Sequence, residues 1–414
     1  MAAPAYHSRG KPRSSLSPAM AHRQPGCGRT LRRRTALPCQ NRAMDSVTQV
    51  ALGSAIGVAV MGRRAGIWKS ALWGGLCGTL PDLDVLIDHG DAIRNMTFHR
   101  TESHALFYLT LVSPLLAGLV HRIHGDGASF RRWWLATWLA LVTHPLLDWL
   151  TIYGTQLGLP FTDHPFAVGS IFVIDPLYTL ALIIGLAAAF VTARRRPGRG
   201  RGWNLLGLGL SSAYLAWSVI AQAQVTAVAQ ASLSAQGLAS ERLLVVPTPF
   251  NTVLWRVLAI DGDSYLEGFH SLLDRGAEID FTRHPRGLDL FRQHQDDWYA
   301  KRIAWFSHGF FRMRHEAGGL QISDLRMGQE PDYTFTFILP QQPCSAAAKP
   351  DAPPAPTCDR AADAQAGAGS APGAGEGQAP TIAVPVLVPQ RIDLGASINW
   401  LWRRMLGERL PNRG

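Results

Sequence analysis

Charged residues are scarce in this sequence of 414 residues. Asp, Glu, Lys and Arg make up 17% of it, against about 25% in an average soluble domain, whereas 47% of the residues are hydrophobic. This balance argues against an ordinary soluble protein. The formal net charge of +10 lies largely in an arginine-rich head and in short loops beside apolar runs. That distribution is typical of membrane proteins and disfavours a nucleic-acid-binding protein.

Cysteine is also rare, and the spacing of the five cysteines indicates no disulfide framework and no CxxC metal motif. A pairing of Cys344 with Cys358 stays an open alternative. A secretory signal is missing as well, because residues 1–43 contain no apolar core followed by a small-residue cleavage site. We interpret 1–43 as a disordered or non-native extension and expect Met44 to be the working start.

Six apolar runs are present. They are Val47–Met61, Ile67–Leu80, Ala105–Val120, Trp133–Leu150, Ile171–Ala193 and Trp203–Ala223. The last two reach the ~20 residues needed to cross ~30 Å of hydrocarbon, the third and fourth nearly do, and the first two are short. The pattern predicts an all-α polytopic membrane domain of about five or six apolar helices over residues 44–223.

Glycines in the first two runs predict close helix packing, because small residues let helix backbones approach in lipid. They are Gly53, Gly57, Gly74, Gly75 and Gly78.

The loops between the runs alternate in charge. The basic loops are "GRRAG", "HRIHGDGASFRRW" and "ARRRPGRGRGW", and the other two connections, 81–104 and 151–170, carry acids and histidines. By the positive-inside rule the basic loops face the cytoplasm. We therefore expect a multi-pass protein of the inner (plasma) membrane, with the acidic loops and everything after the sixth run on the periplasmic side.

The rest of the chain changes character. Residues 224–340 contain short alternating stretches such as "RLLVVPTPF" and "DYTFTFILP", which predict a small, mostly β extramembrane domain. Residues 341–390 are a low-complexity linker rich in Ala, Pro and Gly. The tail, 391–414, contains "INWLWRRMLGERL" and is interpreted as a short amphipathic helix on a membrane surface.

Four polar groups fall on the same predicted face. They are Asp82 and Asp84; His99, Arg100, Glu102 and His104; His144 and Asp148; and Asp163, His164 and Asp175. The spacing of four puts His144 and Asp148 on one helix face. Imidazoles with carboxylates suit Zn²⁺, Mn²⁺ or Fe²⁺, alone or as a two-metal centre. An arginine beside such a site is able to make a forked contact to a phosphate.

Each group also has a structural explanation. Asp82 and Asp84 fit a polar turn after Pro81, and His99 and His104 fit interfacial residues. His144 fits a structural cap or a structural pair with Asp148. Asp175 before Pro176 fits a helix N-cap. The role of Asp163, His164 and Asp175 is left open.

The ordered motifs "MDSVTQVALGSAIG", "GTLPDLDVL", "FHRTESHALF", "LVTHPLLDWLTIYGTQLGLPF" and "GSIFVIDPLYTL" resemble the YdjM-like family of predicted inner-membrane, metal-dependent hydrolases. The resemblance covers about residues 44–340. It implies metal ligands at Asp82, Asp84, His99, His104, His144 and Asp148. This chain has Thr48-Gln49 where many members have Thr-His, and "HRTESHA" where "HRGxTHS" is usual.

The resulting prediction is a membrane enzyme that uses a divalent metal, zinc first with Mn or Fe as alternatives, to hydrolyse an ester or phosphoester. In it, Asp84 or Glu102 handles the proton and Arg100 holds the anion. The expected partners are membrane lipid and a small-molecule or lipid-linked substrate, without nucleic acid. A transporter or ion-handling protein, and a metal-stabilised scaffold without turnover, are the alternatives; transport favours ionisable groups nearer the bilayer midplane.

Overall fold

The structure is a computed structural model that describes residues 42–124, 129–276, 278–316, 318–340, 384–389 and 394–410. The head at 1–43 and the linker at 341–390 lie almost wholly outside the described residues, as do Cys344 and Cys358.

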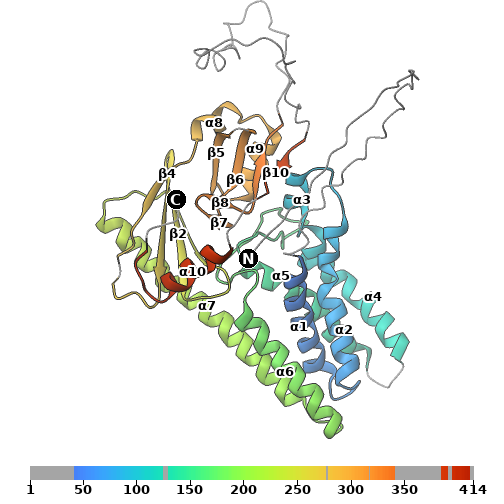
Figure 1. Ribbon diagram of the computed structural model, residues 1–414. Helices are drawn as coiled ribbons and strands as arrows, with labels where there is room; N and C mark the ends of the chain where they lie inside the picture. Colours follow the sequence, from blue (N-terminus) through green and yellow to red (C-terminus); the bar gives the residue numbers. More distant parts are fainter. Residues whose placement is uncertain are drawn as a thin grey trace, which may run out of the picture. The chain divides into compact units, whose positions relative to one another are not determined.

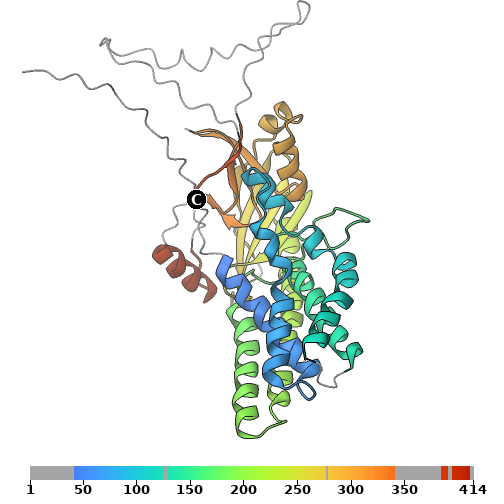
Figure 2. The same ribbon diagram turned by 90° about the vertical axis from the view of Figure 1, so that its right-hand side faces the viewer.

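All six apolar runs fold as helices (Figures 1 and 2). The helical region comprises α1 (Arg42–Met61), α2 (Ile67–Thr79), the 3-10 helix η1 (Pro81–Leu86), α3 (Ala92–Phe98), the 3-10 turn η2 (Glu102–His104), α4 (Leu106–His124), α5 (Phe130–Leu150), α6 (Pro176–Arg195) and α7 (Arg201–Ala235). In both views α1 lies beside α2, and α6 lies beside α7.

Among the described helices, three are long and apolar enough to cross a membrane: α4, α6 and α7. The predicted count of five or six such helices was therefore too high. Helix α2 has only 13 residues, and the apolar part of α1 is confined to Ser46–Met61. Helix α5 has 21 residues, but two arginines in its first turn and His144 and Asp148 near its end make it more polar.

The predicted close packing of the glycines is confirmed between α1 and α2. A Cβ atom on Gly53 would lie 2.3 Å from the carbonyl oxygen of Gly74, and one on Gly57 would lie 2.1 Å from that of Ser70. Both distances are too short for any side chain. Helices α6 and α7 meet in the same way, at Gly185 and Gly207. The two helix pairs are thus fixed by contacts between backbones.

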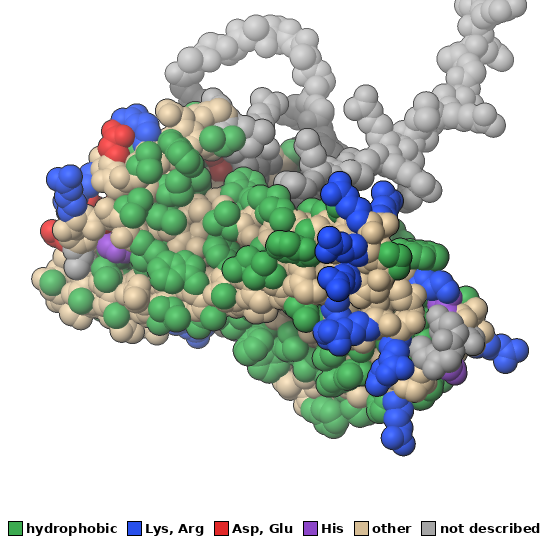
Figure 3. Space-filling view, turned by 90° about the horizontal axis from the view of Figure 1, so that it is seen from below, with side chains coloured by type: hydrophobic (Ala, Val, Ile, Leu, Met, Phe, Trp, Pro, Cys, Tyr) green, Lys and Arg blue, Asp and Glu red, His purple; other side chains and the backbone are tan. Residues whose placement is uncertain are grey.

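Basic side chains gather at one end of these helices. Figure 3 looks onto this end and shows Lys and Arg side chains clustered there. The exposed arginines of the α1–α2, α4–α5 and α6–α7 connections are Arg63, Arg64, Arg122, Arg131, Arg132, Arg194, Arg195, Arg196 and Arg199. The turns η1 and η2, which carry acids and histidines, lie at the other end. The basic loops and the acidic, histidine-bearing segments alternate in the sequence, and in the structure they lie at opposite ends of the helices.

The β region confirms the predicted strands and adds two short helices. Antiparallel strands β1 (Arg242–Pro247), β2 (Leu254–Asp261), β3 (Ser264–Ser271) and β4 (Thr282–Pro285) form one sheet in that order. A second sheet has the order β10 (Val386–Leu387), β9 (Thr336–Ile338), β6 (Gly319–Asp324) and β5 (Phe311–Glu316). The other elements are a small ladder of β7 (Gly328–Gln329) and β8 (Asp332–Tyr333), and helices α8 (Leu288–Gln293) and α9 (Trp298–Phe306).

Three buried arginines of the β region are each matched by a buried carboxylate. Arg256 lies 2.6 Å from Glu267, and Arg326 lies 2.7 Å from Asp324. A third buried pair joins Arg312 to Glu330. Tyr333 is fully buried beside them, and the Arg256 guanidinium donates to its hydroxyl oxygen. Each buried cation of this cluster therefore faces a buried carboxylate.

Helix α7 extends to Ala235, past the expected end of its apolar run at Ala223. The extension carries Val225, Ala229 and Leu233, spaced by four, and these side chains are buried against the β1–β3 sheet. Apolar contacts with the sheet stabilise the helix beyond the point where its hydropathy falls. The Gln222 amide nitrogen also donates to the carbonyls of Val168 and Val245, which ties the loop before α6 to β1.

The tail forms helix α10 (Leu394–Met405), which docks on the β region through an inward-pointing arginine. Arg404 lies 2.7 Å from Asp274 and donates to the Phe269 carbonyl. Ile398 and Trp402, spaced by four, are exposed. The helix is therefore amphipathic, with an apolar stripe on its outer side, and its predicted place on a membrane surface stays a prediction.

Candidate metal centre

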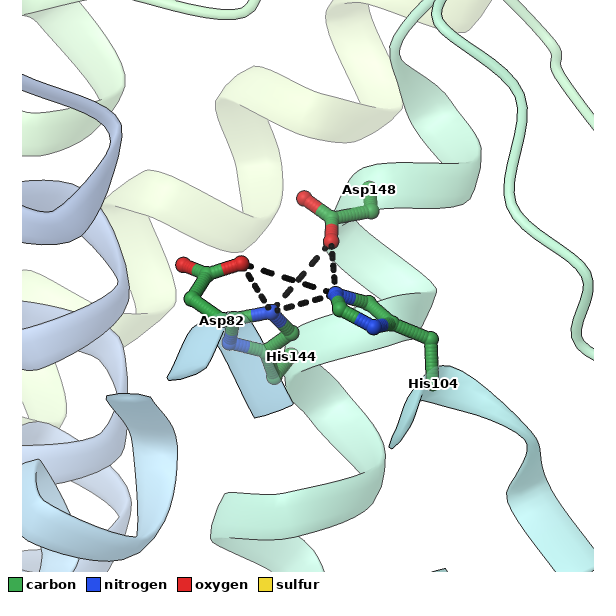
Figure 4. Close-up of side chains that lie close together, drawn as sticks. All are labelled: Asp82, His104, His144 and Asp148. Atoms are coloured by element: carbon green, nitrogen blue, oxygen red, sulfur yellow. Dashed lines mark hydrogen bonds and ion pairs between the residues drawn. The ribbon is translucent and has the colours of Figure 1, made fainter. Parts of the chain in front are cut away.

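Four side chains from three separate segments meet at the end of the helices opposite the basic loops (Figure 4). Asp82 comes from η1, directly after Pro81, and His104 closes η2. His144 and Asp148 lie one turn apart near the end of α5. One ligand atom from each residue lies within 4.8 Å of all the others, and it is the one such group found among the described residues.

The distances show that the four ligand atoms converge. The Nε2 atoms of His104 and His144 are 3.1 Å apart. An oxygen of Asp148 lies 3.3 Å from each of them. Asp82 Oδ1 lies 3.2 Å from His144 Nε2 and 3.5 Å from His104 Nε2. Two imidazole nitrogens and two carboxylate oxygens thus surround a single point.

The other nitrogen of each imidazole is held by an acceptor. His144 Nδ1 lies 2.6 Å from the Gly78 carbonyl oxygen, which accepts only from a protonated nitrogen. His104 Nδ1 lies 2.8 Å from Ser103 Oγ, which in turn donates to Asp84 Oδ2 at 2.7 Å. These partners place the proton on Nδ1 in both rings. The Nε2 lone pairs of both rings then face each other and the two carboxylates.

The two carboxylate oxygens of Asp148 have different surroundings. Oδ1 accepts from the Gln49 amide at 3.1 Å and lies 3.2 Å from the Arg100 guanidinium. Oδ2 faces the two histidines and accepts no hydrogen bond from any described residue. Because Oδ1 is fixed from two sides, Oδ2 is held toward the centre. Arg100 is 2% exposed, so its charge is directed to Asp148 and not to solvent.

The residues present therefore fit a divalent metal ion. A buried carboxylate oxygen without a hydrogen-bond donor is costly, and so are lone pairs that face one another. A cation bound by all four atoms removes both costs, and a set of two imidazoles and two carboxylates suits Zn²⁺, Mn²⁺ or Fe²⁺. His104, His144 and Asp148 are buried, whereas the Asp82 side chain is 17% exposed. The centre consequently meets its surroundings beside Asp82.

Asp84 and His99 lie next to this cluster but are not part of it. Asp84 Oδ1 is 2.8 Å from His99 Nδ1, and Asp84 Oδ2 accepts from the Arg100 backbone and from Ser103. The His99 ring lies 5.8 Å from the His104 ring. Asp84 thus supports His104 through Ser103 and orients His99.

Arg100 adopts a backbone conformation that side-chain-bearing residues rarely take, with φ of 66°. In this conformation its backbone N–H reaches Asp84, its carbonyl accepts from Gln156, and its side chain reaches Asp148. Uncommon backbone conformations of this kind persist where the surroundings fix them, and they cluster at functional sites.

The other candidate residues lie elsewhere. Glu102 is exposed on η2. Asp163 and His164 are exposed on the loop after α5, and the His164 ring contacts His308 of the β region. Asp175 is the N-cap of α6, where its Oδ1 accepts from the backbone N–H groups of Leu177 and Tyr178.

Two supporting residues were not anticipated in these roles. Ser103 links His104 to Asp84 through hydrogen bonds. In the sequence, only its position between Glu102 and the candidate ligand His104 pointed to such a role. Gln49 holds Asp148 through a hydrogen bond from its side-chain amide.

The fold and the cluster together define a multi-helix membrane protein with a buried site of two histidines and two aspartates. Residues 44–225, somewhat less than half of the chain, match the family model described as YdjM inner membrane protein, which confirms the resemblance over that part. The uncharacterized protein YfhP of Bacillus subtilis (strain 168) is 29% identical over 153 residues. That match covers 35% of this chain and 46% of YfhP, so the chain spans less than half of that relative. No solved structure matches the chain.

Proposed function

We propose that this protein is a membrane-bound metal-dependent hydrolase that acts on an ester or phosphoester. The observation that supports it most is the convergence of four ligand atoms, with both Nε2 lone pairs and one oxygen of Asp148 directed to one point. Asp82, His104, His144 and Asp148 would hold the ion, with zinc as the first choice. A divalent ion bound in such a site supplies Lewis-acid activation of water and of the bond to be cleaved.

The residues around the cluster have separate roles in this proposal. Asp84 Oδ1 holds Nδ1 of His99, which leaves Nε2 as the nitrogen that would take a proton from the attacking water. His99 replaces Asp84 and Glu102 as the proposed base, because Asp84 is engaged by three donors and Glu102 points to solvent. Arg100 is proposed to position Asp148 and not to hold the substrate anion, because its guanidinium is buried against that carboxylate.

The hydrolysis then balances as follows. An oxygen of water forms a bond to the phosphorus or carbonyl carbon, and the bond to the leaving alcohol breaks. The proton taken from water by His99 is returned to the leaving oxygen.

The topology of the helices supports a periplasmic location for the site. The basic loops lie at one end and the cluster at the other, and the basic end is expected in the cytoplasm. A reporter fused after Leu410 tests this orientation. Activity of a periplasm-dependent reporter is expected, and activity of a cytoplasm-dependent reporter alone would contradict it.

Metal analysis of the purified protein tests the function. Wild type is expected to bind metal in a fixed ratio and to hydrolyse at least one member of a panel of esters and phosphodiesters. His144→Ala should lose both properties. His164→Ala is the matched control, because that histidine is exposed and outside the cluster, and it should keep both. A wild-type protein without metal would remove the hydrolase proposal, and metal without turnover would leave a metal-stabilised scaffold.

A further inference from the structure

Helix α2 and the turn η1 carry an unbroken apolar stripe that leads to the metal centre. Its members are Trp68, Leu72, Leu76, Leu80, Leu83, Leu86 and Ile87, all of them exposed. The first four are spaced by four residues and lie on one side of α2, while the opposite side of α2 packs on α1.

The stripe continues through the junction of α2 and η1, because the backbone stays helical there. Leu80 is both the C-cap of α2 and the N-cap of η1, and its φ of −60° and ψ of −40° are helical. At rises of ~1.5 Å and ~2.0 Å per residue, α2 and η1 together extend about 30 Å. Although α2 is too short to count as a spanning helix by itself, the outer stripe has the length of a hydrocarbon layer.

Polar residues mark both ends of the stripe. Exposed Arg63 and Arg64 precede α2, and exposed Asp88 follows Ile87 directly. An apolar surface with charge at both ends fits a bilayer, with the water–lipid boundary between Ile87 and Asp88. Asp82 then lies about 10 Å below that boundary at the rise of a 3-10 helix. It faces inward, with exposed Leu83 next to it in the chain.

The metal centre is therefore accessible beside a surface that suits lipid. Asp82 is its partly exposed member. The apolar side chains that stand out beyond it are 56%, 77% and 58% exposed: Leu83 and Leu86 of η1, and Ile87 directly after η1. We call these three residues the η1 lip. A second exposed apolar pair lies near His104, where the rings of Phe107 and Phe161 are 5.5 Å apart.

We propose that the substrate is a long-chain membrane lipid with a phosphoester or ester at its polar–apolar boundary, and that it enters the site sideways from the bilayer across the η1 lip. The inference rests on the proposed hydrolase function. Because Asp82 lies about 10 Å below the boundary at Ile87, the reacting group of the lipid would enter the site below the level of the surrounding headgroups, with its chains on the lip. A diacyl phospholipid and a polyprenyl diphosphate share this chemistry.

The test uses the full-length, metal-loaded protein in lipid nanodiscs. One arm contains phosphatidylglycerol and phosphatidylethanolamine, a second adds a polyprenyl diphosphate, and a third supplies a water-soluble short-chain phosphodiester. Products are measured by mass spectrometry. The variant Leu86→Ser/Ile87→Ser changes the lip. Leu115→Ser on α4, where Leu115 is 74% exposed, is the control for an equally exposed leucine distant in sequence from the ligands.

We expect the lip variant to lower turnover of one long-chain lipid at least ~10-fold, mainly through the apparent KM, while metal content and turnover of the soluble phosphodiester stay at the wild-type level. Leu115→Ser should match wild type in all arms. The inference is overturned if the lip variant cleaves lipid as well as wild type, if it loses both substrates equally, or if only the soluble substrate is cleaved. Metal-loaded wild type that cleaves nothing in any arm overturns the proposed function itself.

Discussion

The buried ionisable groups of the β region and those of the metal centre differ in how their charges are matched. In the β region, Arg256, Arg312 and Arg326 each face one buried carboxylate. Their hydrogen bonds run between oppositely charged groups, so the cluster is complete within the chain. Such pairs lose much of their Coulomb gain to desolvation, and they fix geometry more than they stabilise.

In the candidate metal centre, two carboxylates face two imidazole lone pairs, and among the described residues Arg100 is the one guanidinium paired with these carboxylates. Each imidazole proton is directed outward, to Gly78 or to Ser103. The arrangement suits a cation at the point that these four groups face. The matched ion pairs of this chain therefore indicate a structural role, whereas the converging hydrogen-bond acceptors indicate a ligand site.

The largest effect should come from breaking a matched pair. Glu267→Ala leaves the buried Arg256 guanidinium without its carboxylate and is expected to lower the free energy of unfolding by about 3–5 kcal/mol. Denaturant unfolding in detergent measures it, and metal content per folded molecule should be unchanged. Glu316→Ala, in an exposed pair with Arg314, is the control and should cost below about 1 kcal/mol. Equal losses in the two variants would contradict the structural role.

Metal removal should have the next largest effect and should act only on the helical region. Chelation of wild type is expected to lower stability by about 2.7 kcal/mol if free metal had been at 100 times its Kd. His144→Ala should already have the lower stability and should not respond to chelator. An unchanged melting temperature of wild type after chelation would remove the contrast between the two clusters.

Residues behind the ligands should have a graded effect. Arg100→Gln and Gln49→Ala free Oδ1 of Asp148, and each is expected to weaken metal affinity about 10–100-fold while the ligand set stays intact. Titration with a competing chelator measures this. Loss of all metal in either variant would indicate a ligand and not a positioning residue, and wild-type affinity would indicate no role.

The smallest expected effect is the release of helix α10 from the β region at low pH. Burial raises the pKa of Asp274, but hydrogen bonds from Arg404 outweigh it and lower the pKa below its usual value. A lowered folded-state pKa means that the pair stabilises docking above the ordinary carboxyl range, and that this contribution is lost below about pH 4. Hydrogen exchange of residues 394–405 should rise there, and in Asp274→Asn already at pH 7. Glu408→Gln, in an exposed pair with Arg403, should change little.

The sequence predicted best what depends on near neighbours. His144 and Asp148 share a face because four residues make about one helical turn. The positions of Asp82 and His104 beside them depended on the alternation of the loops, which put distant segments at one end. The choice between Asp82 and Asp84 was not predictable. In a 3-10 helix, residues two apart point about 120° away from each other, so only one of them faces α5.

The helical fold was predicted more fully than its boundaries. All six apolar runs are helices, but hydropathy does not show that α7 continues for 12 residues beyond Ala223, because small residues dilute the signal. Val225, Ala229 and Leu233 become recognisable as a helix face only once the sheet that covers them is known.

The length of α7 has a mechanical consequence. Its 35 residues extend about 50 Å, well beyond the thickness of a hydrocarbon layer, and the far part packs on the β1–β3 sheet. The β1–β3 sheet is therefore attached to a single continuous helix whose apolar part is long enough to span a membrane. Because the far part of α7 packs on the β1–β3 sheet, a change in the tilt of α7 is expected to move this sheet with it.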